Sequence, residues 1–264
     1  MIKKRLTLAV LAVLSALMLA AFAFESEQPK PVESKASLLA IVIDDFGNES
    51  KGTAEMLALP IKLTAAVMPG MPSSAKDAEA FHAAGKAIIL HMPMQSDTGK
   101  ASWLGNLPIT TDLSPETISE RVLFGLNELK YAEGMNNHMG STITKNVTIM
   151  TQLLGILKER DLIMLDSKTT PDSVVEKTAK KLGAKCISRD VFLDGTQDVG
   201  TIINNLRKAA NIAKKTGSAI AIGHVGPEGG VATATAIASL IPELSAEGVQ
   251  FVTLKELYEA LHKQ

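Results

Sequence analysis

Six short apolar runs in this chain each end on, or just before, a residue that can bind a metal or move a proton. Stretches with helical spacing separate most of these runs, which predicts parallel strands joined by helices. Such a sheet places the carboxyl ends of its strands on one face, where α/β folds form their active sites. One polar residue there would mean little, but a set drawn from six runs predicts a functional site. Its members are Asp44, Asp45, His91, His138, Asp166, Asp194 and His224.

The order of these segments predicts an α/β fold of seven or eight β-α units without an internal repeat. Strands are expected over 38–44, 62–68, 87–91, 135–138, 162–166, 184–188, 191–194, 218–224 and 249–254. Helices are expected over 74–84, from 115, and over 147–160, 172–182, 199–215 and 231–246, with Asp172 as a cap. A barrel or barrel-like fold is the leading interpretation, and a doubly wound open sheet is the alternative.

The N-terminus has the three parts of a secretory signal peptide. A basic start (MIKKR) precedes an apolar segment that ends at Ala21-Phe22-Ala23, which predicts cleavage after Ala23 and an exported, periplasmic or secreted protein. The alternative is an uncleaved anchor, because the apolar segment is nearly long enough to span a bilayer. Residues 24–36 are polar, contain two prolines and predict a flexible linker, so that the folded domain covers 37–264.

Charge and cysteine content restrict the partners and the metal ligands. Removing Lys3, Lys4 and Arg5 with the signal takes the net charge from −1 to −4, and no basic stripe remains to bind nucleic acid. No other segment approaches the length of a membrane span. Cys186 is the only cysteine, so a metal site must use histidine and carboxylate ligands.

Asp44 and Asp45 form the strongest candidate pair. Two adjacent acids at the end of a buried strand repel one another unless something positive neutralises them, and a metal does so. Neighbouring side chains of an extended strand point to opposite sides, so one acid is expected to bind the metal while the other takes a proton. The alternative is that Asp45 only forms a turn with Phe46 and Gly47.

His91 and His138 are the best histidine candidates for metal ligands. Imidazole nitrogens and a carboxylate oxygen are the usual ligands of a catalytic zinc, with one position left for water. His82 lies inside a predicted helix and His262 in the C-terminal tail, so both are expected at the surface.

His224 lies in the glycine-rich segment GHVGPEGG and is suited to protonating a leaving amine. Asp166 and Asp194 are expected either to orient a histidine or an arginine such as Arg189, or to serve only in a helix cap or a turn. The chain has no Gly-x-Ser-x-Gly elbow and no His-Glu-x-x-His helix, which argues against serine hydrolases and zincin proteases.

The motifs IVIDDFG, ILHMPMQ, NNHMGS, LDS, VFLD and IGHVGP, in this order, resemble the divergent polysaccharide deacetylase family over residues 38–255. This family is related to the carbohydrate esterase family four deacetylases of chitooligosaccharides and peptidoglycan. The resemblance implies a distorted (β/α) barrel of about seven parallel strands and a divalent metal, commonly zinc. It also implies that Asp44 is the general base, that Asp45 and His91 are metal ligands, and that His224 is the acid.

The chain departs from the standard deacetylases at two places. Their second metal-binding histidine lies four residues after the first, where this chain has Gln95, and we therefore expect His138 to be the third ligand. Their arginine-proline-glycine motif is not recognisable. The leading hypothesis is a metal-dependent hydrolase that removes N-acetyl groups from an envelope or extracellular glycan. The alternative is an inactive, metal-containing barrel that acts as a glycan-binding or cell-envelope regulatory protein.

Overall fold

The structure of this chain is a computed structural model that describes residues 37–263. The predicted signal peptide (1–23) and linker (24–36) lie outside the described residues. Between residues 37 and 263, the helices are too short or too polar to cross a membrane.

The described residues form one sheet of nine strands, and all of the neighbouring strands pair in parallel. The order across the sheet is β6-β5-β4-β3-β2-β1-β8-β7, and β9 pairs with the first residues of β1. The strands are β1 (Ser37–Phe46), β2 (Thr64–Val67), β3 (Ala87–Met94), β4 (Ala132–Met139), β5 (Ile163–Asp166), β6 (Cys186–Ser188), β7 (Val191–Phe192), β8 (Ser218–His224) and β9 (Val249–Val252).

One extended segment joins the two edges of this sheet. Its first part, β6, pairs with β5, and its second part, β7, pairs with β8 at the opposite edge. Only Arg189 and Asp190 lie between the two parts, and the amide of Asp190 donates to the carbonyl of Ile220. The sheet therefore curls round on itself, which confirms the predicted distorted barrel, with nine described strands instead of about seven.

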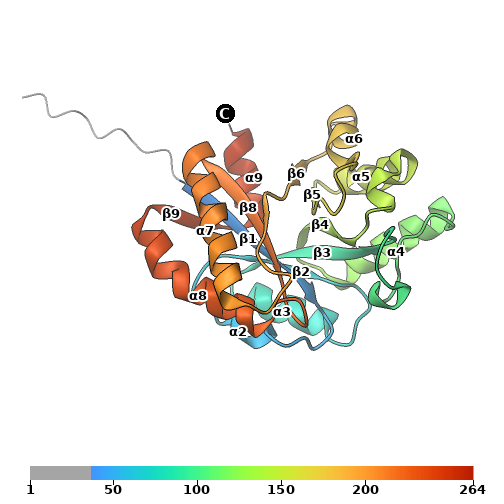
Figure 1. The fold of residues 1–264 in the computed structure, drawn as a ribbon. Coiled ribbons are helices and arrows are strands. Elements are labelled where there is room, and N and C mark those ends of the chain that lie inside the picture. The colour runs from blue at the N-terminus through green and yellow to red at the C-terminus, as the bar shows by residue number, and fades with distance from the viewer. Residues whose placement is uncertain (1–36, 264) are drawn as a thin grey trace, which may run out of the picture. The chain divides into compact units, whose positions relative to one another are not determined.

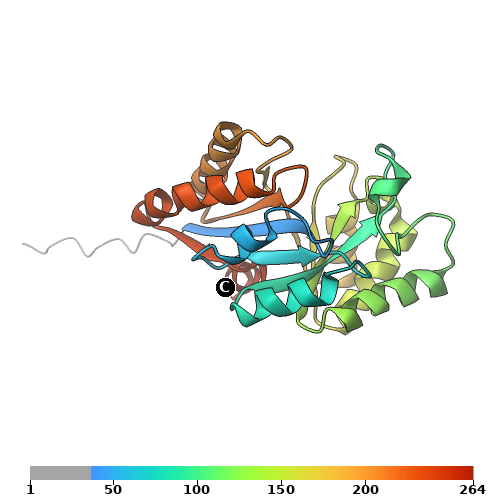
Figure 2. The ribbon, with the colours of Figure 1, turned by 90° about the horizontal axis from the view of Figure 1, so that it is seen from below.

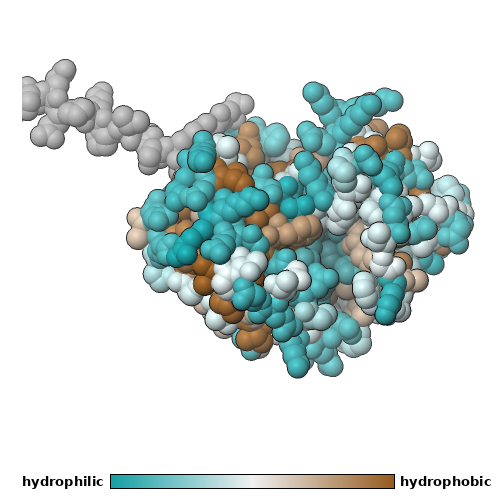
Figure 3. All heavy atoms as spheres, in the orientation of Figure 1, coloured by the Kyte–Doolittle hydropathy of each residue, from teal (hydrophilic) through white to brown (hydrophobic). Residues whose placement is uncertain are grey.

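Helices surround the outer side of the curled sheet (Figures 1 and 2). They are α2 (Thr53–Leu57), α3 (Ser74–Ala83), α4 (Pro115–Glu128), α5 (Val147–Glu159), α6 (Val175–Leu182), α7 (Val199–Thr216), α8 (Val231–Ala246) and α9 (Leu254–His262), with short 3-10 turns η1 (Ala101–Trp103) and η2 (Ile143–Lys145). The surface of the face seen in Figure 1 is hollowed near its middle, where β3 and β4 lie, with mainly hydrophilic residues around the hollow (Figure 3).

The alternation of side chains along β1 divides the core in two. Leu39, Ile41 and Ile43 belong to the large apolar cluster that also contains the buried faces of the helices. Ala40 and Val42 belong to a second, smaller cluster of strand residues. Asp44 continues the alternation of this second set, so its side chain is directed to the inside of the barrel.

Helix α9 closes the amino-terminal end of the barrel, and the sequence analysis did not predict it. Leu254 and Leu257 are buried in the inner cluster, and the amide of Leu254 donates to Thr64 Oγ1 at the start of β2. A Thr253–Glu256 capping box begins the helix, and this signal was available in the sequence. His262 therefore lies in a helix and not in a tail, although it is exposed as expected.

The prediction that Asp172 caps a helix is wrong. Helix α6 begins at Val175, and no side chain caps its N-cap residue, Val174. The hydroxyl of Ser173 instead accepts from the Val175 amide and donates to Asp166 Oδ2, which fixes the turn before the helix.

Because Leu257 seals the inner core, Leu257→Ala should lower the free energy of unfolding by about 2–5 kcal/mol, the range for a buried leucine. Leu261, on the same helix but 45% exposed, provides the matched control. Leu261→Ala should change the free energy by less than about 0.5 kcal/mol. Urea denaturation of the two variants tests this assignment, and equal effects would contradict it.

Candidate metal centre

A β-bulge at the end of β1 turns Asp45 toward the site. The pairing of β1 with β2 shifts register between Ile43 and Phe46, and Asp45 has a left-handed backbone with φ of 70°. The expectation that the neighbouring carboxylates point to opposite sides is therefore wrong. Asp44 and Asp45 both reach the carboxyl end of the barrel because the backbone between them is not extended.

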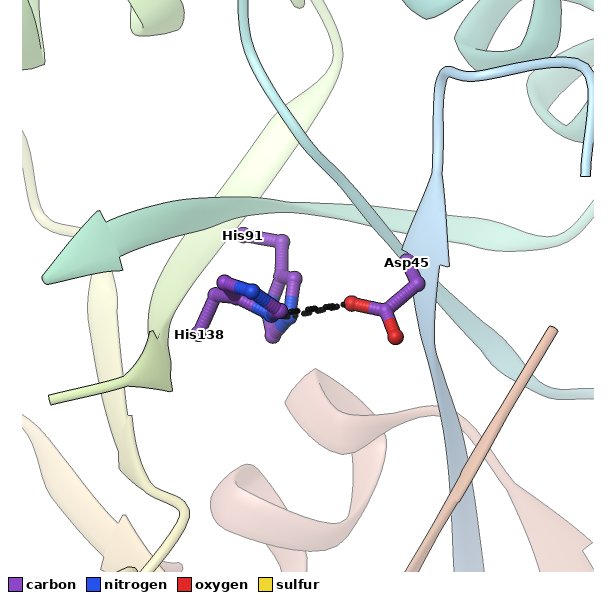
Figure 4. Close-up of side chains that lie close together, drawn as sticks. All are labelled: Asp45, His91 and His138. Carbon is purple, nitrogen blue, oxygen red and sulfur yellow. Dashed lines mark hydrogen bonds and ion pairs between the residues drawn. The ribbon is translucent and has the colours of Figure 1, made fainter. Parts of the chain in front are cut away.

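Asp45, His91 and His138 converge on one point from β1, β3 and β4 (Figure 4). Asp45 Oδ1 lies 3.1 Å from His91 Nε2 and 3.0 Å from His138 Nδ1. The two imidazole nitrogens are 3.1 Å apart. Three potential ligand atoms thus form a nearly equilateral triangle. The structure brings together the three residues expected to bind the metal.

The second ring nitrogen of each histidine fixes which nitrogen faces the triangle. His91 Nδ1 donates to Asn136 Oδ1 at 2.7 Å, and His138 Nε2 donates to the carbonyl of Trp103 at 3.0 Å. With both protons assigned to these bonds, His91 Nε2 and His138 Nδ1 carry lone pairs directed at Asp45. In the neutral form of both imidazoles, three electron-pair donors therefore face one another without a proton between them, and this is the form that binds a metal.

This donor set fits a divalent metal. Ligand bonds of about 2.0–2.1 Å in a tetrahedral zinc site imply edges of about 3.3 Å between ligand atoms, close to the edges of this triangle. Burial raises the pKa of Asp45, but the two imidazoles outweigh it and hold this pKa well below its usual value. Burial lowers the pKa of His91, but the Asp44 and Asp45 carboxylates outweigh burial and raise it. The group therefore attracts a cation.

Asp44 lies behind the triangle and is almost completely buried, with 2% of its surface exposed. Its Oδ1 accepts a hydrogen bond of 2.9 Å from Asn136 Nδ2 and lies 3.7 Å from His91 Nδ1. Burial is the main cause that raises the pKa of Asp44 above its usual value. A carboxylate with a raised pKa beside the donor triangle is suited to accepting a proton.

His224 pairs with Asp44 across the β1–β8 ladder and is held by Asp194. Its Nδ1 donates to Asp194 Oδ1 at 2.6 Å, and its amide donates to Asp194 Oδ2 at 2.7 Å. Thr233 Oγ1 also donates to Asp194 Oδ2. Burial lowers the pKa of His224, but the bond to Asp194 and the nearby carboxylates of Asp45 and Asp44 raise it to about 10. The bond to Asp194 thus favours the protonated form of His224, which can donate a proton.

Glycine is required at position 229, where the backbone packs closely against Asp194 and Thr233. A Cβ on Gly229 would lie 2.1 Å from Thr233 Oγ1 and 2.2 Å from Asp194 Oδ2. The glycines of GHVGPEGG therefore serve the approach of the backbone to the aspartate that holds His224.

Asp166 and Arg189 lie together but do not hold a site histidine. Asp166 accepts from the Lys168 amide and the Ser173 hydroxyl, which corresponds to the turn interpretation. Its carbonyl accepts the Arg189 amide, while the Arg189 guanidinium donates to the carbonyls of Ser167 and Lys168. The guanidinium carbon lies 3.6 Å from the centre of the Phe192 ring. The expectation that Asp166 orients a histidine is therefore wrong, and its contact with Arg189 is through the backbone.

Gln95 points away from the donor triangle. Its side-chain oxygen accepts from the backbone amide and the hydroxyl of Thr111, and its backbone amide donates to the Ile109 carbonyl. These bonds tie together the two ends of the long loop that follows β3. Gln95 is thus a loop anchor, and His138 provides the nitrogen of the third donor.

Sequence reasoning missed three residues that support the site: Asn136, Thr233 and Trp103. Asn136 was detectable, because it lies two residues before His138 on the same face of β4. Thr233 lies in a helix far along the chain from Asp194, and Trp103 acts through its backbone carbonyl, so neither carries a sequence signal.

A family model described as divergent polysaccharide deacetylase matches residues 41–258. This chain belongs to that family. The match covers every residue of the site described above, from Asp44 to Thr233.

Two curated relatives share this sequence at moderate identity. An uncharacterized protein of Haemophilus influenzae is 37% identical over 191 residues, 72% of this chain and 68% of that protein. The uncharacterized protein YibQ of Escherichia coli is 34% identical over 192 residues, 73% of this chain and 60% of YibQ. The aligned residues therefore span about two thirds of each relative's length.

Solved structures show the same fold at low identity. An uncharacterized protein from Agrobacterium tumefaciens aligns with a TM-score of 0.77 at 20% identity, covering 84% of this chain and 89% of that chain. The catalytic domain of a peptidoglycan N-acetylglucosamine deacetylase from Eubacterium rectale aligns with a TM-score of 0.53 at 15% identity, covering 83% of this chain and 89% of that chain. A carbohydrate esterase family four pseudoenzyme from Bacillus anthracis aligns with a TM-score of 0.51 at 13% identity, covering 85% of this chain and 66% of that chain. At these identities the comparison establishes the fold alone.

Removing one member of the triangle should remove the metal. His138→Ala should bind less than a tenth of the zinc that the wild type retains, because only two donors remain. His82→Ala is the matched control, since His82 is exposed on α3 and stacks on Tyr131. Elemental analysis after zinc reconstitution and dialysis measures both, and equal zinc in the two variants would contradict the assignment.

The Asn136 amide should matter to metal affinity without touching the metal. Asn136→Ala frees His91 to rotate and should weaken zinc binding about 10- to 100-fold, the range for a residue that orients a ligand. Asn137→Ala is the control, because Asn137 bonds the Met139 carbonyl and the Ser167 amide instead. Competition with a zinc-binding dye gives both affinities. Unchanged affinity in Asn136→Ala would overturn the role of the amide.

Proposed function

We propose that this chain is a metal-dependent hydrolase that removes N-acetyl groups from an envelope or extracellular polysaccharide. The observation that carries the proposal is the arrangement of Asp44 and His224 beside the donor triangle. One is a buried acceptor, the other is a donor held by Asp194, and they pair across neighbouring strands. Amide hydrolysis needs both groups, because a proton leaves the attacking water and another must reach the departing amine.

Asp45, His91 and His138 would hold the metal, for which we propose zinc. When bound, a divalent metal acts as a Lewis acid that lowers the pKa of water and polarises a carbonyl group. Asp44 takes the proton from the attacking water, and its bond from Asn136 keeps the carboxylate aimed at the site. His224 then gives a proton to the amine as the C–N bond breaks. The products are acetate and a free amino group on the sugar.

The assignment of the proton donor depends on Asp194. Its carboxylate is fully enclosed and accepts from the ring and the amide of His224 and from the Thr233 hydroxyl. With Nδ1 engaged, Nε2 is the ring nitrogen of His224 left to face the substrate. This is the arrangement that a proton donor needs.

We further propose that the protein acts outside the cytoplasm, in the periplasm or after secretion. The support is the basic, apolar and small-residue pattern of residues 1–23, with cleavage after Ala23. Envelope glycans that carry N-acetyl groups occur in that location.

A second candidate is an inactive, metal-containing barrel that binds glycan or regulates the envelope. Gln95 favours it, because the position of the second metal histidine of standard deacetylases here anchors a loop. The fold also supports both outcomes, since deacetylases and a pseudoenzyme share it. This candidate predicts zinc and glycan binding without acetate release.

The variant Asp44→Asn tests the hydrolase proposal against the inactive barrel. The substitution keeps the shape of the side chain and removes the base, so acetate release from N-acetylated glycans should fall about 10²- to 10⁴-fold while zinc stays bound. An enzyme-coupled acetate assay of zinc-loaded protein, beside elemental analysis, gives both values. Acetate release by the variant at the wild-type rate would exclude Asp44 as the base. No release by the wild type from any N-acetylated glycan would favour the second candidate.

A further inference from the structure

Trp103, the only tryptophan of the chain, lies at the rim of the candidate site. It ends the 3-10 turn η1 in the loop after β3, and the residue is 59% exposed. Scattered exposed apolar residues are ordinary on protein surfaces. This one is set apart by its place next to a metal-ligand candidate.

A cleft of about 640 Å³ is lined by Trp103 and by two members of the donor triangle. Asp45 and His138 line it together with Trp103 and Met139, and Pro227 and Glu228 come from the glycine-rich segment after β8. A ligand in this cleft therefore meets the indole and the Asp45 and His138 side of the donor triangle.

A backbone hydrogen bond ties the residue that carries the indole to the donor triangle. The Trp103 carbonyl accepts the hydrogen bond from His138 Nε2, so the residue that carries the ring also holds a ligand candidate. The loop is anchored to η2 and to the residue before it, because Asp97 accepts a hydrogen bond from Thr142 and forms an ion pair with Lys145. The ring is thus carried by an anchored loop.

The surroundings of the ring favour binding on an aromatic face. Gly99 leaves room beside the ring, because a Cβ there would lie 2.5 Å from Met139 Cε and 3.4 Å from Trp103 Cε3. Lys100 Nζ lies 5.7 Å from the ring centre. The face of an indole is electron-rich and attracts the slightly positive C–H groups of a sugar ring, while Glu228 across the cleft can accept hydrogen bonds from hydroxyl groups.

We propose that Trp103 is a specificity-determining residue: its indole binds the pyranose ring of an N-acetylated amino sugar next to the metal donors. This inference deepens the proposed function and rests on it for the identity of the sugar. The apolar face orients the sugar ring, and the backbone bond to His138 keeps the residue that carries the indole beside the metal donors.

The test measures binding of tetra-N-acetylchitotetraose by calorimetry in the zinc-loaded protein that carries Asp44→Asn, so that the probe is not consumed. Adding Trp103→Ala should weaken binding about tenfold and leave zinc content unchanged, because the carbonyl that holds His138 remains. Tyr131→Ala is the matched control, since Tyr131 is 41% exposed and stacks on His82 outside the cleft lining. Trp103→Phe should recover part of the affinity, because a smaller aromatic face remains.

In the protein with Trp103 intact, the single tryptophan should shift its emission to shorter wavelength as the probe covers it. Equal affinity with and without the indole, or no binding of the probe at all, would overturn the proposal. Failure of the proposed function is distinguishable: wild type would release no acetate while the dependence of binding on Trp103 stayed.

Discussion

The amide of Asn136 joins the two halves of the site, and the rest of the arrangement depends on it. Its oxygen accepts from His91 and its nitrogen donates to Asp44, so one side chain sets the tautomer of a metal-ligand candidate and the direction of the base. An amide can do this because it offers an acceptor and donors in one plane. Burial strengthens both bonds, since no water competes for them.

The strands that build the site leave regular β geometry where they reach it. Asp45 is the penultimate residue of β1 and Met139 is the last residue of β4, and each has a positive φ, which is uncommon for residues other than glycine. The bulge at Asp45 brings a second carboxylate to the inside of the barrel. The turn at Met139 lets its carbonyl accept from Asn137 and Thr169. Local strain and the hydrogen bonds that hold it thus accompany the convergence of the donors.

The alternation of apolar runs and helical spacing was enough to predict a parallel α/β sheet with Asp44, His91, His138 and His224 on one face, while the family resemblance favoured the barrel over an open sheet. It could not place Asp45, because a period of two assigns its side chain to the other side and only the bulge reverses this. Asp166 and Asp194 look alike in the sequence, since both end apolar runs. They differ in what lies nearby: Asp194 meets His224 on the neighbouring β8, whereas Asp166 meets the hydroxyl of Ser173 in its own loop.

We expect Asp45, His91 and His138 to hold one metal ion although Gln95 occupies the place of a metal ligand of the standard deacetylases. A crystal of the zinc-loaded protein, measured on both sides of the zinc absorption edge, tests it most directly. One strong anomalous peak is expected in contact with Asp45 Oδ1, His91 Nε2 and His138 Nδ1. A peak that excludes His138, or no peak in a fully loaded crystal, would contradict this assignment of the ligands.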